Sequence, residues 1–291
     1  MLTKITVFYN PFAGRNKTAR MHKALKPLAE KGFQLKLVET QLLKESNQIN
    51  RDYIDAIKEQ DAVLIVGGDG SIGNVLNGLG EHLKIPFGVL PLGTINLLAR
   101  EMKVTEQNFD TAFYNNQTQD IHLGQVNERL FCITTSVGID ASAVVNVDLE
   151  LKRKIGRLAY IVSLLKTLKE GKGDAFKVRC HEQSFNAKAV IVMNGCYYAG
   201  SNQLGQNTSL KSRGFEIYLL KENNIFNLIK YGLNIFFNRL HHSKNVQVLQ
   251  SDELEITSEK QAPLQIDGDP GPDLPATIKS FAQTYKIVAD L

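Results

Sequence analysis

The feature that most constrains this chain is a glycine-rich stretch, Gly67–Ser71, between an apolar run and a helical repeat. The five residues before it, 62–66, are all apolar, which is typical of a strand buried on both faces. The apolar residues after it recur at helical spacing, at Ile72, Val75, Leu76 and Leu79. A strand, a glycine turn and a helix in this order predict one βα unit of a parallel sheet.

Similar units surround this stretch. Further strands are expected at Ile5–Tyr9, Phe33–Val38 and Phe87–Leu90, and helices at residues 18–30, 53–59 and 95–102. Repeated βα units predict an α/β fold with a doubly wound, Rossmann-like parallel sheet and helices on both of its faces. From about Ile121 the pattern changes to strands separated by turns, expected at 121–126, 130–135, 185–192, 215–220, 246–250 and 254–257. We therefore expect an α/β domain over residues 1–121 and a β-rich domain over residues 122–277.

Composition narrows the class of protein. A chain of 291 residues with 43% hydrophobic and 22% charged residues is typical of a globular protein with two cores. A net charge of +4 permits attraction to phosphates or anionic headgroups and does not indicate nucleic-acid binding. The sequence has no signal-peptide pattern and no apolar stretch near the roughly 20 residues of a membrane span. We expect a cytoplasmic protein, with at most peripheral membrane contact.

Two glycine turns carry the first chemical signal. The first glycine turn, Gly67–Ser71, and the second, Pro91–Asn96, follow successive strands and each opens a helix. Glycines there let backbone N–H groups approach phosphate oxygens, and helix N-termini favour anions. Two such turns at one sheet edge predict a shared nucleotide, and Asn10–Gly14 after the first strand adds a third loop. The structural alternatives are a helix-capping Asp69 in the first turn and a helix-capping Thr94 in the second.

Asp69 needs a separate explanation, because a carboxylate repels phosphate unless a cation, a water or a transferred proton lies between them. A second acidic signal lies far downstream, in the turn Asp267–Asp269, which we call the Asp-Gly-Asp turn. Two carboxylates at a strand end suit a metal or a general base. The alternative is an ordinary β-turn, in which Asp-Gly is frequent. The chain has no Walker A sequence, and residues 68–73 imitate the dinucleotide-binding glycine pattern only weakly.

Together these motifs resemble the diacylglycerol kinase catalytic-domain family, which includes bacterial lipid kinases and the sphingosine and ceramide kinases. The matching residues are Asn10-Pro11 with Gly14 and Lys17, Thr40, the first glycine turn through Asn77-Gly78, the second glycine turn with Ala99-Arg100, and the Asp-Gly-Asp turn. The resemblance implies a β-sandwich as the second domain and a last strand, about 278–291, that completes the first. It also implies ATP and Mg²⁺ as cofactors, with ATP in a cleft between the domains.

The resemblance assigns roles to individual residues. Nucleotide contacts are implied for Asn10, Thr40, Gly67, Gly68, Asp69, Gly70, Ser71, Ile72, Gly73, Thr94 and Asn96. The general base is expected in the Asp-Gly-Asp turn, at Asp267 or Asp269, with Asp69 as the second candidate. Asn74 stands where the family usually has Glu, and residues 95–97 depart from its Gly-Asn-Asp. Arg213 replaces the aspartate of a structural magnesium site, so the metal ligands remain unknown.

Two helices are candidates for contact with a lipid surface. Residues 157–169 follow the basic run 152–154, and residues 225–240 combine aromatic and basic side chains. The alternative is that the apolar faces of both helices cover the sheet of the second domain. His241-His242 lacks a third ligand at a zinc-site spacing.

The sequence therefore predicts an ATP-dependent kinase acting on a hydroxyl of a diacylglycerol-like or sphingoid-like lipid. Two other readings stay open: a kinase of the NAD kinase type with a soluble substrate, and a catalytically silent lipid-binding or regulatory protein. No motif identifies the lipid or the oligomeric state, and a homodimer is one of the states that stay open.

Overall fold

The structure is a computed structural model that describes residues 2–13, 15–41, 49–138 and 175–290. The predicted helix at 157–169 lies outside these residues. Among the described residues, none of the helices combines the length and the hydropathy of a membrane span. The chain divides into two compact units, each described by itself below. The first contains residues 1–123, 128–130 and 281–291, and the second contains residues 124–127 and 131–280.

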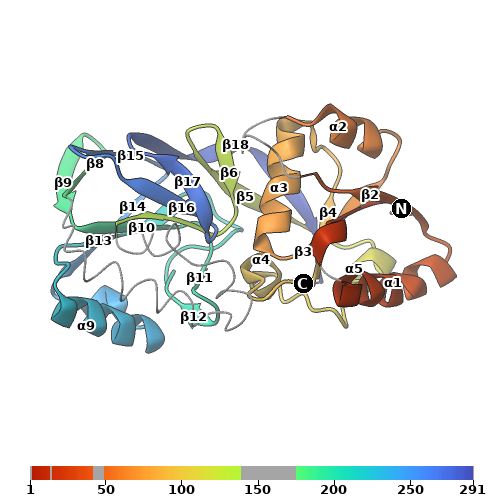
Figure 1. The fold of residues 1–291 in the computed structure, drawn as a ribbon, viewed down its shortest axis with the longest axis horizontal. Coiled ribbons are helices and arrows are strands. Elements are labelled where there is room, and N and C mark those ends of the chain that lie inside the picture. The colour runs from red at the N-terminus through yellow and green to blue at the C-terminus, as the bar shows by residue number, and fades with distance from the viewer. Residues whose placement is uncertain (1, 14, 42–48, 139–174, 291) are drawn as a thin grey trace. The chain divides into compact units, whose positions relative to one another are not determined.

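The sheet of the first unit is parallel, as predicted (Figure 1). Its strands are β1 (Lys4–Tyr9), β2 (Gln34–Glu39), β3 (Ala62–Gly67) and β4 (Phe87–Pro91), in the order β2-β1-β3-β4. The far end of β18 (Ala276–Val288) pairs with β4 in parallel, with Ile287 opposite Phe87. The helices are α1 (Arg15–Glu30), α2 (Arg51–Ile57), α3 (Asp69–Leu79), α4 (Leu97–Glu101) and α5 (Thr111–Tyr114). Figure 1 shows α1 on one side of this sheet and α2 and α3 on the other.

Burial explains why β3 and β4 form the centre of this sheet. The first five residues of β3 and the first four of β4 are buried, as expected for strands covered by helices on both faces. Glycine turns follow both strands, so polar backbone is placed at the carboxyl edge of an otherwise apolar sheet. The α/β class predicted from the sequence is confirmed.

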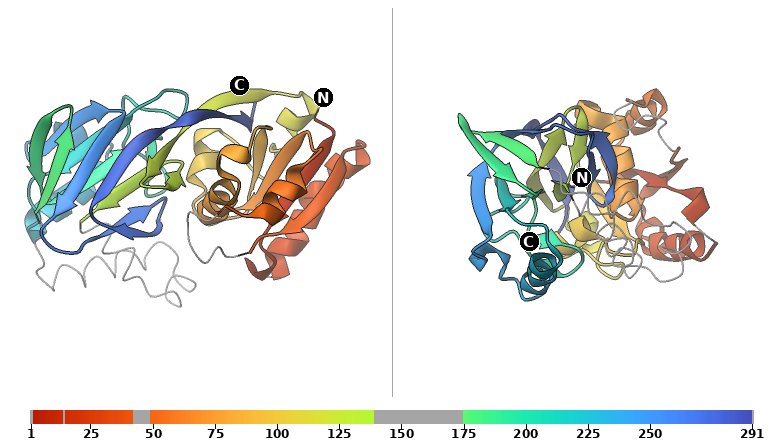
Figure 2. Two further views of the ribbon diagram at one scale, coloured as in Figure 1. Left: turned by 90° about the horizontal axis from the view of Figure 1, so that it is seen from above. Right: turned by 60° about the vertical axis from the view of Figure 1, so that its left-hand side comes forward.

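The second unit is an antiparallel β-sandwich (Figures 1 and 2). One sheet has the order β14-β13-β10-β7-β16-β17, and the other contains β9, β8, β15 and the first part of β18. The strand bounds are β7 Thr134–Val137, β8 Phe176–Cys180, β9 Gln183–Ala187, β10 Ala189–Met193, β13 Phe215–Leu220, β14 Val246–Ser251, β15 Glu253–Ser258, β16 Pro263–Ile266 and β17 Asp269–Asp273. Buried Val137, Val192 and Ile217 from one sheet and Val178 and Ile256 from the other share one core.

The remaining elements of the described residues connect or cover these sheets. They are β5 (Thr118–Val126), β6 (Arg129–Phe131), the hairpin β11 (Tyr197–Tyr198) and β12 (Asn202–Gln203), the helix α9 (Ile225–Phe236), and three single 3-10 turns, η1 (Pro11–Ala13), η2 (Gly80–His82) and η3 (Leu240–His242). A second apolar cluster joins α9 to the outer face of β10 and β13, through Tyr231, Ile191 and Tyr218. One side of α9 is therefore core, as the structural alternative for this helix expects.

The structure corrects several predicted boundaries. The single strand predicted at 130–135 is two strands, because the N–H groups of Cys132 and Ile133 donate to Asp267 instead of a neighbouring strand. The single strand predicted at 185–192 is interrupted at Lys188, where the chain passes from one sheet to the other. The strands β8 and β17 were not predicted. The helix expected over residues 225–240 ends at Phe236.

Candidate active site

The predicted nucleotide residues of the first unit follow four strands of one parallel sheet. Asn10 follows β1, Thr40 follows β2, and the two glycine turns follow β3 and β4. Because these strands are parallel and adjacent in the sheet, their carboxyl ends lie at one edge. The fold thus gathers at one edge the residues that the sequence places at 10, 40, 67–73 and 94–96.

The two glycine turns pack directly against each other. A Cβ atom on Gly93 would lie 2.4 Å from the Cα of Gly68 and 2.4 Å from Oδ1 of Asn96. A Cβ atom on Gly68 would lie 3.0 Å from the Cα of Gly93. The N–H of Leu92 also donates to the carbonyl of Gly67 at 3.0 Å. Backbone therefore meets backbone at this point, and only glycine fits at Gly93.

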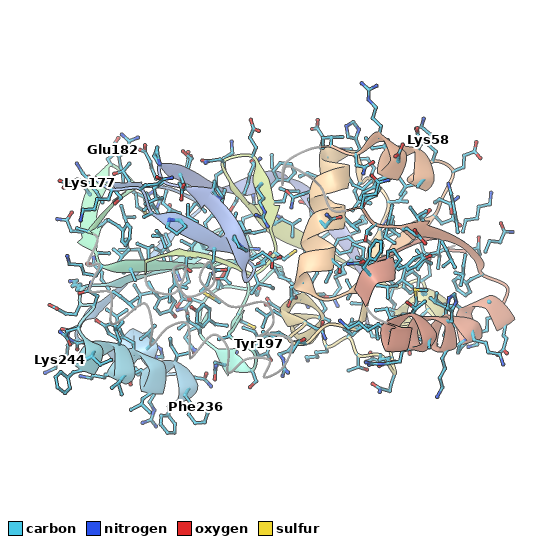
Figure 3. All side chains as sticks on the ribbon, in the orientation of Figure 1. Lys58, Lys177, Glu182, Tyr197, Phe236 and Lys244 are labelled. Carbon is cyan, nitrogen blue, oxygen red and sulfur yellow. The ribbon has the colours of Figure 1, made fainter. Side chains whose placement is uncertain are left out.

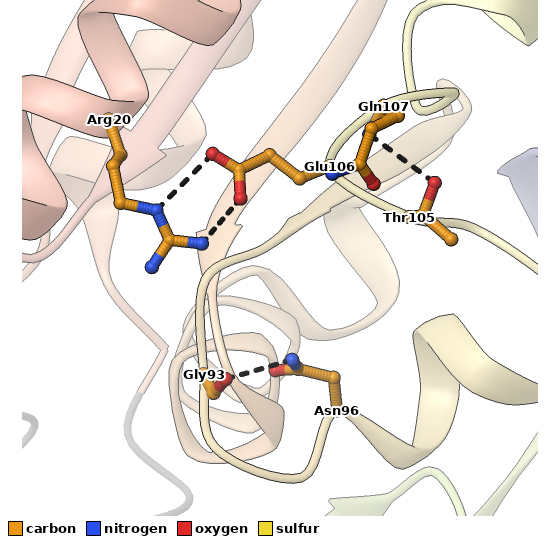
Figure 4. A network of polar contacts seen from close by, with 6 residues as sticks. All are labelled: Arg20, Gly93, Asn96, Thr105, Glu106 and Gln107. Carbon is orange, nitrogen blue, oxygen red and sulfur yellow. Dashed lines mark hydrogen bonds and ion pairs between the residues drawn. The ribbon is translucent and has the colours of Figure 1, made fainter.

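Asn96 shapes the second turn. Its φ of 56° is in the left-handed region, which Asn tolerates better than most residues, and α4 begins after it at Leu97. Its Nδ2 donates to the carbonyl of Gly93 at 3.0 Å (Figure 4). Its Oδ1 is buried and accepts no hydrogen bond from the described residues. Thr94 is exposed and does not cap α4, so the capping alternative for Thr94 is wrong.

Asp69 is held by the N-terminus of α4. It is the first residue of α3, and its carboxylate accepts the N–H of Leu98 at 3.3 Å. Burial raises the pKa of Asp69, while hydrogen bonds from the N–H groups of Leu97, Leu98 and Asn96 act in the opposite direction. The alternative that Asp69 caps its own helix is wrong, because Gly68 is the N-cap of α3. The amides of α4 partly offset the burial of a carboxylate that seemed out of place among glycines predicted to bind phosphate.

Asn10 and Thr40 are joined through Tyr9. The Oδ1 atom of Asn10 accepts the N–H of Phe12 at 2.8 Å, which fixes the loop after β1. The N–H of Thr40 donates to the carbonyl of Tyr9 at 2.7 Å, and its hydroxyl lies 3.3 Å from the same oxygen. Both residues are half-buried. Gly14, which shares this loop in the resemblance, lies outside the described residues.

Sequence reasoning treated Asn74 only as a departure from the family, and the structure gives it a contact. Its Nδ2 donates to the carbonyl of Gln41 at 3.2 Å, and its Oδ1 accepts the hydroxyl of Tyr53 at 3.3 Å. The same Tyr53 hydroxyl accepts the N–H of Gln41 at 2.8 Å. Asn74 therefore holds the segment that contains Thr40.

Two further contacts brace this unit. Asn77, one turn along α3, exchanges hydrogen bonds with both backbone groups of Leu130, at 2.8 and 3.1 Å. Arg20 of α1 forms a two-point ion pair with Glu106, in the loop after α4 (Figure 4). Both pairs join residues more than 50 positions apart, so no local pattern in the sequence indicates them.

The Asp-Gly-Asp turn lies in the second unit, as a hairpin between β16 and β17. Asp267 and Gly268 have φ values of 49° and 85°, and Ile266 pairs with Asp269 across them, so the predicted β-turn is present. The carboxylate of Asp267 accepts three backbone N–H groups, from Cys132 at 2.6 Å, Ile133 at 2.8 Å and Thr134 at 2.9 Å. Asp267 is thereby fixed in one orientation.

A buried carboxylate fixes the loop before β13, the region in which the Arg213 departure lies. The buried carboxylate of Glu216 accepts the N–H groups of Gln206 at 3.0 Å and Asn207 at 2.6 Å, and also the hydroxyl of Tyr218. Burial and this carboxylate raise the pKa of Tyr218. Across the described ranges, no three His, Cys, Asp or Glu side chains are grouped as metal ligands. The backbone amides of Gln206 and Asn207 satisfy the carboxylate of Glu216, a residue that the sequence analysis missed.

Comparison with known families covers nearly the whole chain. Residues 4–126 match the family described as "Diacylglycerol kinase catalytic domain". Residues 134–289 match the family described as "YegS C-terminal NAD kinase beta sandwich-like domain".

Individual relatives have low sequence identity to this chain, but each match covers nearly all of both chains. The chain is 27% identical to a protein from Streptococcus pneumoniae serotype 4 named "Putative lipid kinase", over 98% of both chains. It is 22% identical to a Bacillus subtilis "Diacylglycerol kinase", over 98% of this chain and 95% of the relative. Among solved structures, a diacylglycerol kinase from Bacillus anthracis str. Sterne superimposes with a TM-score of 0.77, at 20% identity, over 99% and 97% of the two chains. An NAD kinase from Archaeoglobus fulgidus in complex with ATP gives 0.54, at 15% identity, over 98% and 93%.

Proposed function

The chain belongs to the family that joins a diacylglycerol kinase catalytic domain to a YegS C-terminal β-sandwich domain, and from this we propose that it is an ATP-dependent lipid kinase. It transfers the γ-phosphoryl group of ATP to a hydroxyl of a diacylglycerol-like or sphingoid-like lipid. We place the nucleotide domain at residues 1–121 with 278–291, and the lipid-substrate domain at 122–277.

The interlocked glycine turns are the observation that carries this proposal. Phosphoryl transfer needs alignment and charge stabilisation more than covalent chemistry. The turns after β3 and β4 supply backbone N–H groups at a sheet edge, and α3 begins inside the first of them. Asn10, Thr40 and Thr94 follow strands of the same edge. We assign the triphosphate to this surface. Mg²⁺ bound with ATP supplies charge neutralisation of the phosphates.

Asp269 is the proton acceptor that we favour. Asp267 is less suited, because three backbone N–H groups already stabilise its carboxylate and fix it as the anchor of the turn. Asp69 is the second candidate, because the N–H of Leu98 at the start of α4 holds its carboxylate in place. In the proposed step, Asp269 takes the proton of the lipid hydroxyl while the oxygen of that hydroxyl forms a bond to the γ-phosphorus. The bond from that phosphorus to the bridging oxygen breaks, and ADP leaves.

Product analysis tests the proposal. The protein is incubated with ATP, Mg²⁺ and a total lipid extract, and the lipids are compared by mass spectrometry with and without protein. We expect one lipid class to gain the mass of a phosphoryl group, and we expect Asp269→Asn to reduce that product at least about a hundredfold. An unchanged lipid profile with the wild-type protein contradicts the proposal.

Phosphorylation of NAD is the competing enzymatic function, since residues 134–289 match a domain family whose description names NAD kinase. Adding NAD to the same reaction separates the two, because the phosphorylated product is then water-soluble. The silent-protein alternative draws on the departures from the family at Asn74 and Arg213, and the first of these has a structural explanation. Asn74 has a structural role in holding Gln41, so its departure from the family does not by itself indicate lost catalysis.

A further inference from the structure

The helix α9 presents an apolar surface that the described residues of its own unit do not cover. Nine large apolar side chains of the described residues are exposed, and six of them lie on this helix and its C-terminal end. We call these six the α9 face: Ile225, Phe226, Ile229, Leu233, Phe236 and Phe237. Phe226 is 82% exposed and Phe236 is 68% exposed. Exposed apolar residues grouped in this way indicate an interaction site.

The α9 face is distinct from the side that packs on the sheet. Tyr231 is buried, and Leu228 and Ile235 are partly buried against the cluster on the outer face of β10 and β13. At 100° per residue, the six exposed positions fall within about a third of the helix circumference, away from these three. Figure 3 shows Phe236 pointing away from the strands of the unit. The helix therefore has two apolar sides, and only one is needed for folding.

Charge around the α9 face indicates what it contacts. No acidic residue occurs between Glu222 and Asp252, a segment that contains Lys230, Arg239 and Lys244. These three side chains are exposed, and Lys230 borders the apolar arc of the helix. Aromatic residues flanked by cations suit the boundary between anionic headgroups and acyl chains. A second copy of the chain fits less well, because a symmetric contact would bring like charges together.

We propose that the α9 face inserts into an anionic lipid bilayer and holds the protein at its surface. The helix lies in the plane of the interface, with Phe226 and Phe236 among the acyl chains and Lys230 and Arg239 at the phosphates. Only the role of this binding, which is to bring the enzyme to a lipid substrate, rests on the proposed function. The binding itself needs neither ATP nor catalysis.

Vesicle co-sedimentation of the full chain tests the proposal. The vesicles contain equal parts of phosphatidylglycerol and phosphatidylcholine, and pure phosphatidylcholine vesicles serve as the neutral comparison. We expect Phe226→Gln with Phe236→Gln to weaken binding at least about tenfold, because two inserted rings are lost. Lys230→Gln with Arg239→Gln should weaken binding about tenfold on the anionic vesicles alone and reduce its salt dependence. The matched control is Leu37→Gln, an exposed apolar residue of β2 in the other unit.

The outcomes separate the proposal from its rivals. Binding by the wild-type protein that the Phe226 and Phe236 substitutions leave unchanged overturns it, and so does the absence of binding. A dimer in sedimentation velocity that these substitutions abolish, with vesicle binding unaffected, assigns the surface to a second copy instead. Circular dichroism confirms that the variants keep their fold, which is expected because both side chains are exposed.

A kinase assay with short-chain, monomeric diacylglycerol distinguishes failure of this inference from failure of the proposed function. If the protein phosphorylates the monomeric lipid but binds no vesicle, the α9 proposal falls and the kinase stands. If it binds vesicles through α9 but phosphorylates no lipid in any form, the kinase proposal falls and the α9 proposal stands. We expect the α9 variants to lose activity on vesicles and to keep it on the monomeric lipid.

Discussion

In the first unit the glycine turns after β3 and β4 touch each other, whereas in the second unit the glycine of the Asp-Gly-Asp turn has open space around it. A Cβ atom at Gly93 would collide with Gly68, and a Cβ atom at Gly268 would meet no atom within 4 Å. Gly268 is required instead by its φ of +85°. The first region uses glycine to bring two backbones together, and the second uses it to reverse a strand. This difference gives them different sensitivities to substitution.

Alanine substitutions at Gly93 and Gly268 should give the largest difference in stability between the two regions. Gly93→Ala should cost about 3 kcal/mol of unfolding free energy, because the new Cβ meets the backbone of Gly68 as well as the side chain of Asn96. ATP affinity should fall with it. Gly268→Ala should cost about 1 to 2 kcal/mol, the strain of a left-handed alanine. Urea denaturation of both variants measures the contrast, and equal losses would contradict our account of the first region.

The two carboxylates of the Asp-Gly-Asp turn should separate stability from activity. Asp267→Ala leaves the N–H groups of residues 132–134 without their acceptor and should cost about 3 kcal/mol. Asp269→Asn keeps the size and shape of the side chain, so it should cost less stability than Asp267→Ala while lowering the rate of phosphoryl transfer at least about a hundredfold. Thermal unfolding and kinase rates measured on the same preparations check both statements. A rate of transfer unchanged by Asp269→Asn would remove Asp269 as the base.

Asp69 predicts a pH dependence of stability. Burial raises its pKa, so the folded state is favoured while Asp69 is protonated and loses that advantage as the pH rises through the folded-state pKa. The difference in melting temperature, Asp69→Asn minus wild type, should therefore become more positive from acidic to neutral pH.

Asp61 supplies a control of opposite sign for that measurement. Hydrogen bonds from the N–H groups of Lys4 and Thr3 lower the pKa of Asp61, so its contribution is present at neutral pH and is lost as the pH falls. Asp61→Asn should thus become more destabilising from acidic to neutral pH. If both variants shift in the same direction, the burial argument for Asp69 is wrong.

The smallest expected effect is at Asn74. Asn74→Ala removes one hydrogen bond to Gln41 and one from Tyr53 and should cost about 1 kcal/mol. Because this segment contains Thr40, the KM for ATP should rise severalfold while kcat changes little. A fall in kcat with an unchanged KM would mean that Asn74 acts on the reaction and not on the nucleotide.

The sequence predicted the first region better than the second. A buried strand, a glycine turn and a helical repeat are local patterns, so β3 and α3 could be read directly, and the parallel order of the strands follows from repeated βα units. The Asp-Gly-Asp turn was visible as a turn. Its anchoring to residues 132–134 was not visible, because those partners lie more than 130 positions away and interrupt a predicted strand.

The same contrast applies to single residues. Asn96 was singled out as an amide at a helix entrance, but its left-handed backbone, which delays α4 to Leu97, follows from packing between the two glycine turns. Glu216 was missed because a lone acidic residue in a strand gives no signal of the two loop amides it accepts. For α9 the helical spacing was correct, and only the structure shows that its two apolar sides have different environments.

Transfer of radiolabelled γ-phosphate from ATP to a total lipid extract, with NAD in the same reaction, tests the central claim most directly. We predict that wild-type protein moves label into the organic phase, and that Gly93→Ala and Asp269→Asn each abolish this, the first by losing ATP binding and the second with ATP binding retained. Label that remains entirely in the aqueous phase, or that enters NAD, would contradict the assignment of this chain as a lipid kinase.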